Sequence, residues 1–148
     1  MEYLAKIKWH ILMILYFEWG IQMSKITEFL KKSGCEDVAN ATEQRFLEDD
    51  EFYFSLLREV FSDDGFRRLG VELTQGQTQQ AFDTAHMLKG VISNCGLTPL
   101  YNVIVQIVEL LRIGSTETTV LLNAYQELLK ELDKIKLANK CQAVFEKN

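Results

Sequence analysis

Proline is almost absent from this chain, and cysteine and histidine are scarce. One Pro occurs in 148 residues, and because proline breaks helix interiors, its rarity favours long helices. The three cysteines, Cys35, Cys95 and Cys141, have no C-x-x-C spacing. An odd, scattered set is typical of free thiols in a reducing compartment rather than of a disulfide framework. The two histidines, His10 and His86, are too few for a His-rich metal site, so we expect no metal site in this chain.

Basic residues are outnumbered by acidic ones. The chain has 16 Lys and Arg against 21 Asp and Glu, a net charge of −5. A nucleic-acid-binding domain needs a basic face that neutralises phosphates, so we do not expect a nucleic-acid partner. Hydrophobic residues make up 47% of the chain and charged residues 25%. This composition excludes a disordered chain and fits one globular domain with a sizeable core.

Residues 1–22 form an apolar N-terminal extension. The uncharged run 9–17 is too short to span a membrane, which takes roughly 20 apolar residues. Residues 19–22 lack the small side chains of a signal-peptide cleavage site, and Met23 resembles a natural protein start. We expect an extra helix, packed on the body or on a partner, or upstream sequence ahead of Met23; a weak membrane anchor is the third possibility. A chain that begins at Met23 would discriminate between them. For the body of the protein we expect a cytoplasmic location.

The apolar residues from position 23 onward follow a helical period, and no useful stretch alternates with a period of two. Short connections between helices of similar length favour antiparallel neighbours. The sequence therefore predicts an all-α fold over residues 23–148: an antiparallel up-down four-helix bundle with an additional N-terminal helix or helices. The expected helices cover 24–33, a segment from Asn40 to 61, 66–73, 77–95, a segment begun by Thr98 and Pro99, and a last helix capped by Ser115 or Thr116.

The ends of these helices are predicted from capping residues and breaks. Asn40, with Glu43 three residues later, is typical of a capped helix start. Thr98 followed by Pro99 is typical of a cap and a first helical position. Glycines are common just past helix ends, and the expected breaks contain Gly34, Gly65, Gly76, Gly96 and Gly114.

His86 does not fit the apolar pattern of its helix. On a wheel of about 100° per residue, His86 points about 130° from the centre of the apolar face. That face comprises Ala81, Ala85, Leu88, Ile92 and Cys95. An exposed histidine on a helix is most often inert. However, Lys89 places an ammonium one turn from the imidazole, and Gly90 costs about 1 kcal/mol relative to Ala in a helix interior. A neutral imidazole is a nucleophile near neutral pH, and a lysine suits phosphoryl oxygens.

The sequence around His86 resembles the histidine-containing phosphotransfer (HPt) domain. Residues 85–90 read A-H-M-L-K-G, and 94–97 with Leu100 supply the N-x-G and leucine that follow in that family. Upstream, residues 45–61 resemble its first bundle helix. The resemblance covers roughly residues 24–135.

This resemblance implies a phosphocarrier without kinase activity of its own. His86 would accept a phosphoryl group through Nε2 from an aspartyl phosphate on a receiver domain, and pass it to another receiver. Lys89 would stabilise the phosphoryl oxygens, and Gly90 would let the receiver approach. Receiver domains occur in response regulators and hybrid histidine kinases. These proteins would be the partners in two-component signalling. The receiver would supply Mg²⁺ and the acceptor aspartate.

The chain departs from the family in two places. The family often has Gln or Glu 22 positions after the histidine, where this chain has Val108. Gln106 and Glu109 are close in sequence but not equivalent. Val91 and Ile92 stand where the family often has Ser or Ala.

The expected partner surface surrounds His86. It comprises Gln79, Phe82, Asp83, Lys89, Gly90 and Ser93. Phe82 lies at the border of the apolar face, so either a core position or an exposed docking position is compatible with the sequence.

Three alternative functions are weaker. A sensor-kinase dimerisation domain has H-E-x-x-T/N-P, whereas Met-Leu-Lys-Gly follows His86. No hydrolase or P-loop motif is present. The acidic run 48–51 lacks the spacing of a calcium loop and is better explained as a solvated helix start.

A non-catalytic helical adaptor that binds a signalling partner without phosphorylation remains the main alternative, and it predicts no effect of His86→Gln.

Overall fold

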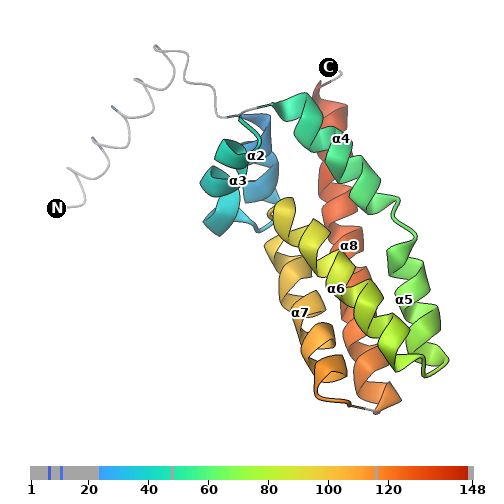
Figure 1. The fold of residues 1–148 in the computed structure, drawn as a ribbon. Coiled ribbons are helices and arrows are strands. Elements are labelled where there is room, and N and C mark those ends of the chain that lie inside the picture. Colours follow the sequence, from blue (N-terminus) through green and yellow to red (C-terminus); the bar gives the residue numbers. More distant parts are fainter. Residues whose placement is uncertain (1–6, 8–10, 12–23, 48, 116, 147–148) are drawn as a thin grey trace.

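The computed structural model describes residues 7, 11, 24–47, 49–115 and 117–146. Their regular structure is all-helical, with no strand in these ranges. The elements are α2 (Lys25–Lys32), the short 3₁₀ helix η1 (Glu36–Val38), α3 (Ala39–Arg45), α4 (Asp50–Phe61), α5 (Gly65–Thr74), α6 (Thr78–Asn94), α7 (Thr98–Arg112) and α8 (Thr118–Glu146) (Figure 1). The predicted extension 1–22 lies outside the described residues, apart from positions 7 and 11.

Helices α5, α6, α7 and α8 form a closed ring of contacts. α5 packs on α6, α6 on α7, α7 on α8, and α8 again on α5. The connections are short, so consecutive helices run in opposite directions (Figure 1). α4 lies end to end with α5 along the same side (Figure 1), and α2 contacts α3, α4 and α8. The elements α2, η1 and α3 precede these helices in the chain.

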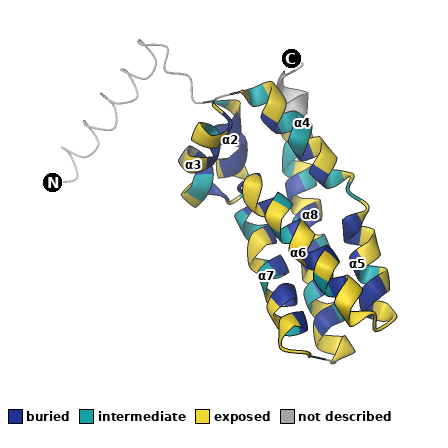
Figure 2. Ribbon diagram, viewed as in Figure 1, coloured by how far each residue is buried: buried dark blue, intermediate teal, exposed yellow. Residues whose placement is uncertain are grey.

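The core lies between the inward faces of these helices (Figure 2). All five residues of the predicted apolar face of α6 are buried: Ala81, Ala85, Leu88, Ile92 and Cys95. On α8 the buried positions include Leu121, Leu128, Leu132 and Ile135, while Ala124, also predicted to face inward, is half-buried. The helical period therefore identified the buried face of the site-bearing helix.

Most of the predicted helix ends are confirmed. Ser24 caps α2, where its hydroxyl accepts a hydrogen bond from the backbone of Thr27. After α2, α5, α6 and α7 the chain reverses through a glycine with positive φ, a conformation that side chains other than glycine rarely adopt. These glycines are Gly34, Gly76, Gly96 and Gly114. Gly65 instead begins α5.

Three predicted details are wrong. Asn40 is not the N-cap of α3. The helix begins one residue earlier, at Ala39, and its N-cap is Val38. Thr98 is the first residue of α7 rather than its cap, although Pro99 does lie in the first turn. The segment from 40 to 61 is not one helix, because it is interrupted between α3 and α4. At this break Leu47 has φ of +51°.

The acidic run at residues 48–51 explains where the chain becomes helical again. Asp49 is the N-cap of α4, and its carboxylate accepts a hydrogen bond of 3.0 Å from the backbone N–H of Phe52. Asp50 and Glu51 lie in the first turn, where negative charge is favourable to the helix dipole. The prediction of a solvated helix start is confirmed at these residues.

The last helix, α8, is the longest element at 29 residues. Its buried tyrosine fixes it to α5, because Tyr125 Oη donates a hydrogen bond of 2.8 Å to the carbonyl of Phe66. Neither α8 nor any other helix in the described ranges combines the length and the apolar character needed to cross a membrane.

Candidate functional site

All seven residues predicted for the site lie on α6. At 100° per residue, the other six fall within about 60° of His86 on the helical wheel. The stripe from Gln79 to Ser93 is about 21 Å long at 1.5 Å per residue. Figure 2 shows exposed residues along this outward side of α6, opposite the side that enters the core. The structure thus assembles the predicted residues on one accessible face.

His86 is exposed near the middle of this stripe, as its place on the helical wheel predicts. Its ring contacts that of Phe82, with centroids 5.9 Å apart and planes inclined by 27°, a stacked arrangement. No hydrogen bond joins the imidazole to any residue in the described part of the chain. Neither ring nitrogen is therefore engaged within the described chain, and the residue as a whole faces solvent.

Phe82 lies between the core position and the exposed position that the sequence left open. It is half-buried and packs against the hydrophobic core, and the same ring stacks on His86. The rings are four residues apart, a spacing that brings side chains together on a helix. Sequence analysis missed this contact, although the i, i+4 spacing of two rings was a usable signal for it.

The charged and polar neighbours of His86 differ in whether their side chains form ion pairs or hydrogen bonds. Lys89 is half-buried, and no carboxylate of the described residues forms an ion pair with its ammonium. Asp83 accepts a hydrogen bond of 3.0 Å from the amide of Gln79 one turn earlier. The ammonium of Lys89 is thus available to an anionic group bound at His86.

Gly90 has no packing role in the described structure. A Cβ atom built on Gly90 meets nothing within 4 Å, and its φ is not positive. At Gly70, by contrast, a Cβ would lie 2.5 Å from Tyr125 Oη, so that glycine is required by close approach of α5 and α8. Glycine at position 90 costs helix stability and leaves an open surface one turn from His86.

The neighbouring helix α7 supplies no hydrogen-bonding partner to the imidazole. Val108 is fully buried in the core, and its side chain is apolar. Gln106 is exposed, and Glu109 is paired with Arg112 at 2.6 Å. Neither Gln106 nor Glu109 therefore forms a hydrogen bond with His86 in place of the Gln or Glu that the resembled family often has at the position of Val108.

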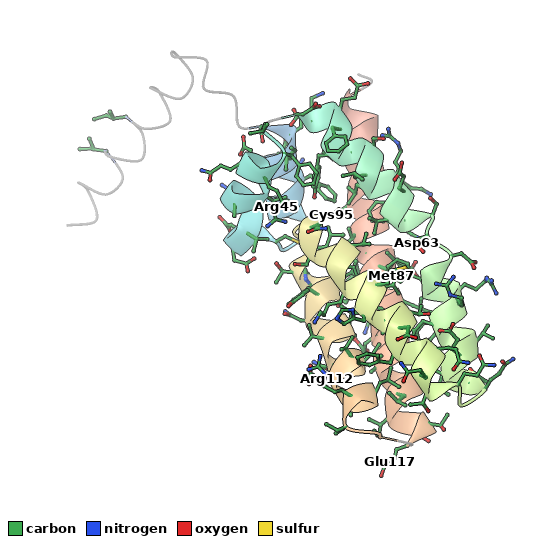
Figure 3. All side chains as sticks on the ribbon, viewed as in Figure 1. Arg45, Asp63, Met87, Cys95, Arg112 and Glu117 are labelled. Carbon is green, nitrogen blue, oxygen red and sulfur yellow. The ribbon has the colours of Figure 1, made fainter. Side chains whose placement is uncertain are left out.

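The C-terminal end of α6 is held by a residue far away in sequence. Arg45 Nη1 donates to the carbonyls of Ser93 at 3.2 Å and of Asn94 at 2.8 Å. Figure 3 shows Arg45 and Cys95 at this same end of the helix. A cationic side chain here satisfies carbonyls that have no partner within the helix and opposes the negative end of its dipole. No local signal could have predicted this contact, because 48 residues separate Arg45 from Ser93.

A surface pocket adjoins this end of the site. It has a volume of about 430 Å³ and is lined by residues of η1, α3, the end of α6, the α6–α7 connection and α7, with Arg45, Ser93 and Tyr101 among them. Ser93 is thus exposed at the border between the His86 stripe and this pocket.

The buried thiols near this end are poor nucleophiles. Burial raises the pKa of the Cys95 thiol to about 11, and it raises the pKa of Cys35 to about 11 as well. Burial also raises the pKa of Tyr53, whose hydroxyl donates to the carbonyl of Cys95 at 2.8 Å. Because the thiolate is the reactive form, neither thiol competes with His86 as a nucleophile near neutral pH.

Comparison with known proteins identifies no relative of this chain. A scan against protein-family models and searches of curated proteins and of solved structures all return no match. Within the described residues, no group of three or more His, Cys, Asp or Glu is arranged to hold a metal ion. The functional argument therefore rests on the residues of α6 and their surroundings.

Proposed function

We propose that this protein is a phosphorelay intermediate of the histidine-containing phosphotransfer type. In this proposal His86 accepts a phosphoryl group from the aspartyl phosphate of a receiver domain and passes it to another receiver domain. The observation that carries the proposal is the open surface at Gly90, one turn from an exposed imidazole with no hydrogen-bonding partner in the described chain. An inert surface histidine gives no reason for a glycine there.

The reaction needs little from the protein beyond position and charge. The lone pair of neutral His86 Nε2 forms the N–P bond while the bond from phosphorus to the aspartyl oxygen breaks, which leaves a free carboxylate on the receiver. Transfer to the second receiver reverses these changes. Lys89 carries a positive charge beside the phosphoryl oxygens, and such transfers depend mainly on positioning and charge stabilisation. Mg²⁺ and the acceptor aspartate belong to the receiver in this scheme, so the chain needs no cofactor of its own.

The helical arrangement is compatible with this role. We interpret the closed set of contacts among α5, α6, α7 and α8 as an antiparallel up-down four-helix bundle, with α4 extending the line of α5. In such a bundle a central residue of one helix can face solvent while the opposite face enters the core. The two buried free thiols fit a reducing compartment, so the proposal places the reaction in the cytoplasm.

The experiment is phosphoryl transfer from a panel of labelled receiver domains of the source genome to three full-length proteins. These are the wild type, His86→Gln and His10→Gln. The chain has two histidines, so the pair of variants assigns any phosphohistidine to one position. We expect acid-labile, base-stable label on the wild type and on His10→Gln, and complete loss of label on His86→Gln.

Two outcomes would contradict the proposal. Label that persists on His86→Gln places the acceptor elsewhere. Absence of label from every receiver, with all three proteins folded by circular dichroism, leaves a helical adaptor in which His86 is inert.

A further inference from the structure

The imidazole of His86 is constrained by an aromatic ring instead of a hydrogen bond. Side chains on a helix lean toward its N-terminus, so each residue lies over the one four positions earlier. His86 accordingly lies over Phe82, with ring centroids 5.9 Å apart. Phe82 is itself half-buried and packed against the core, so the surface that the imidazole lies on is fixed to the body of the protein.

No hydrogen bond or ion pair from another described residue restricts this ring. Val108 is buried and apolar, and Glu109 is paired with Arg112. An exposed imidazole without such restraint populates several side-chain rotamers. The stack on Phe82 favours one of these orientations.

We infer that Phe82 is a positioning residue that holds the His86 imidazole in the orientation used for phosphoryl transfer. Its ring covers the side of the imidazole toward the start of α6. On the other side Gly90 leaves the surface open, so a phosphoryl donor can approach the imidazole from the side of Gly90 and Lys89. Orientation established before the reaction lowers the entropic part of its barrier. This inference rests on the proposed function, but its test does not require a receiver domain.

The test uses phosphoramidate, a small phosphoryl donor that needs no partner protein. His86 Nε2 forms the N–P bond while the bond between phosphorus and the donor nitrogen breaks and ammonia leaves. The full-length wild type is compared with Phe82→Leu, which keeps apolar volume and removes the ring, and with Phe82→Tyr, which keeps the ring. Aromatic stacking contributes about 0.5–1.5 kcal/mol beyond area burial, which converts to about a two- to tenfold slower phosphorylation of His86 in Phe82→Leu. Phe82→Tyr should restore the wild-type rate.

A second readout reports the stack itself. In NMR spectra the ring protons of His86 should be shifted by the ring current of Phe82, and this shift should vanish in Phe82→Leu and persist in Phe82→Tyr. Phe52→Leu is the matched control, because Phe52 is an exposed phenylalanine on α4 whose ring contacts Phe46. It should change neither the His86 resonances nor the rate. Urea unfolding of each variant shows whether the compared proteins are folded.

Loss of the shift together with the slower rate, both restored by Phe82→Tyr, supports the inference. Unchanged His86 resonances in folded Phe82→Leu would overturn it, as would a lost shift with an unchanged rate. If the phosphoramidate result holds but no receiver transfers label to His86, then the proposed function fails while the positioning role of Phe82 stands.

Discussion

At the scale of single residues, the glycine at position 90 lowers the stability of its helix but leaves the surface near His86 accessible. A methyl group at this position would meet no atom within 4 Å, and alanine is the better helix former. The fold could therefore accommodate almost any small side chain at position 90. In the proposed function, the benefit of glycine is the approach of a partner to His86.

We expect Gly90→Ala to raise the free energy of unfolding by up to about 1 kcal/mol, the difference between the two residues in a helix interior. The matched control is Gly70→Ala, whose new methyl would lie 2.5 Å from Tyr125 Oη and should destabilise the protein by about 1–3 kcal/mol. Urea unfolding followed by circular dichroism measures both. A loss of stability in Gly90→Ala would show that this glycine serves the fold after all.

At the scale of elements, the chain between α3 and α4 depends on a cap rather than on apolar spacing. The hydrophobic period runs across the break, yet Leu47 adopts a positive φ and Asp49 begins a new helix. The contact of α2 with α4 requires α4 to start in a particular direction. The carboxylate of Asp49 fixes that start.

We expect Asp49→Ala to lower the free energy of unfolding by about 0.5–2 kcal/mol, because the backbone N–H of Phe52 loses its acceptor. Asp49→Asn keeps a capping oxygen and should stay within a few tenths of a kcal/mol of the wild type. Denaturant unfolding of the two variants measures the difference. Equal losses in both would attribute the effect to charge instead of capping.

At the scale of the whole molecule, the core encloses ionisable groups that bind protons more tightly in the folded chain than in the unfolded one. Burial raises the pKa of Cys35 and of Cys95 from 9.0 to about 11. Cys141, by contrast, is exposed. The unfolded chain therefore releases thiol protons at a lower pH than the folded chain does.

The sign of the pH dependence follows from this difference. Below about pH 9 the thiols are protonated in both states and their contribution to stability is complete. As the pH rises from about 9 toward 11, the unfolded state binds fewer protons, so the free energy of unfolding decreases. Urea unfolding between about pH 8 and about pH 10 should show this decrease. The slope should be smaller when Cys35 and Cys95 are both replaced by Ala; equal slopes in the wild type and in this double variant would contradict the prediction.

The sequence by itself determined the local features of this protein. Its helical period identified the buried face of α6 and the exposure of His86, and its glycines marked the ends of α2, α5, α6 and α7. These features depend on residues within one or two turns of each other, which is the range over which helical geometry and capping act.

The tertiary structure alone decided features that join distant residues. It placed Arg45 on the carbonyls of Ser93 and Asn94. It also anchored Phe82 in the core, so that this ring both packs inward and supports His86. Such contacts depend on how the faces of different helices meet, and no spacing along a single helix specifies that.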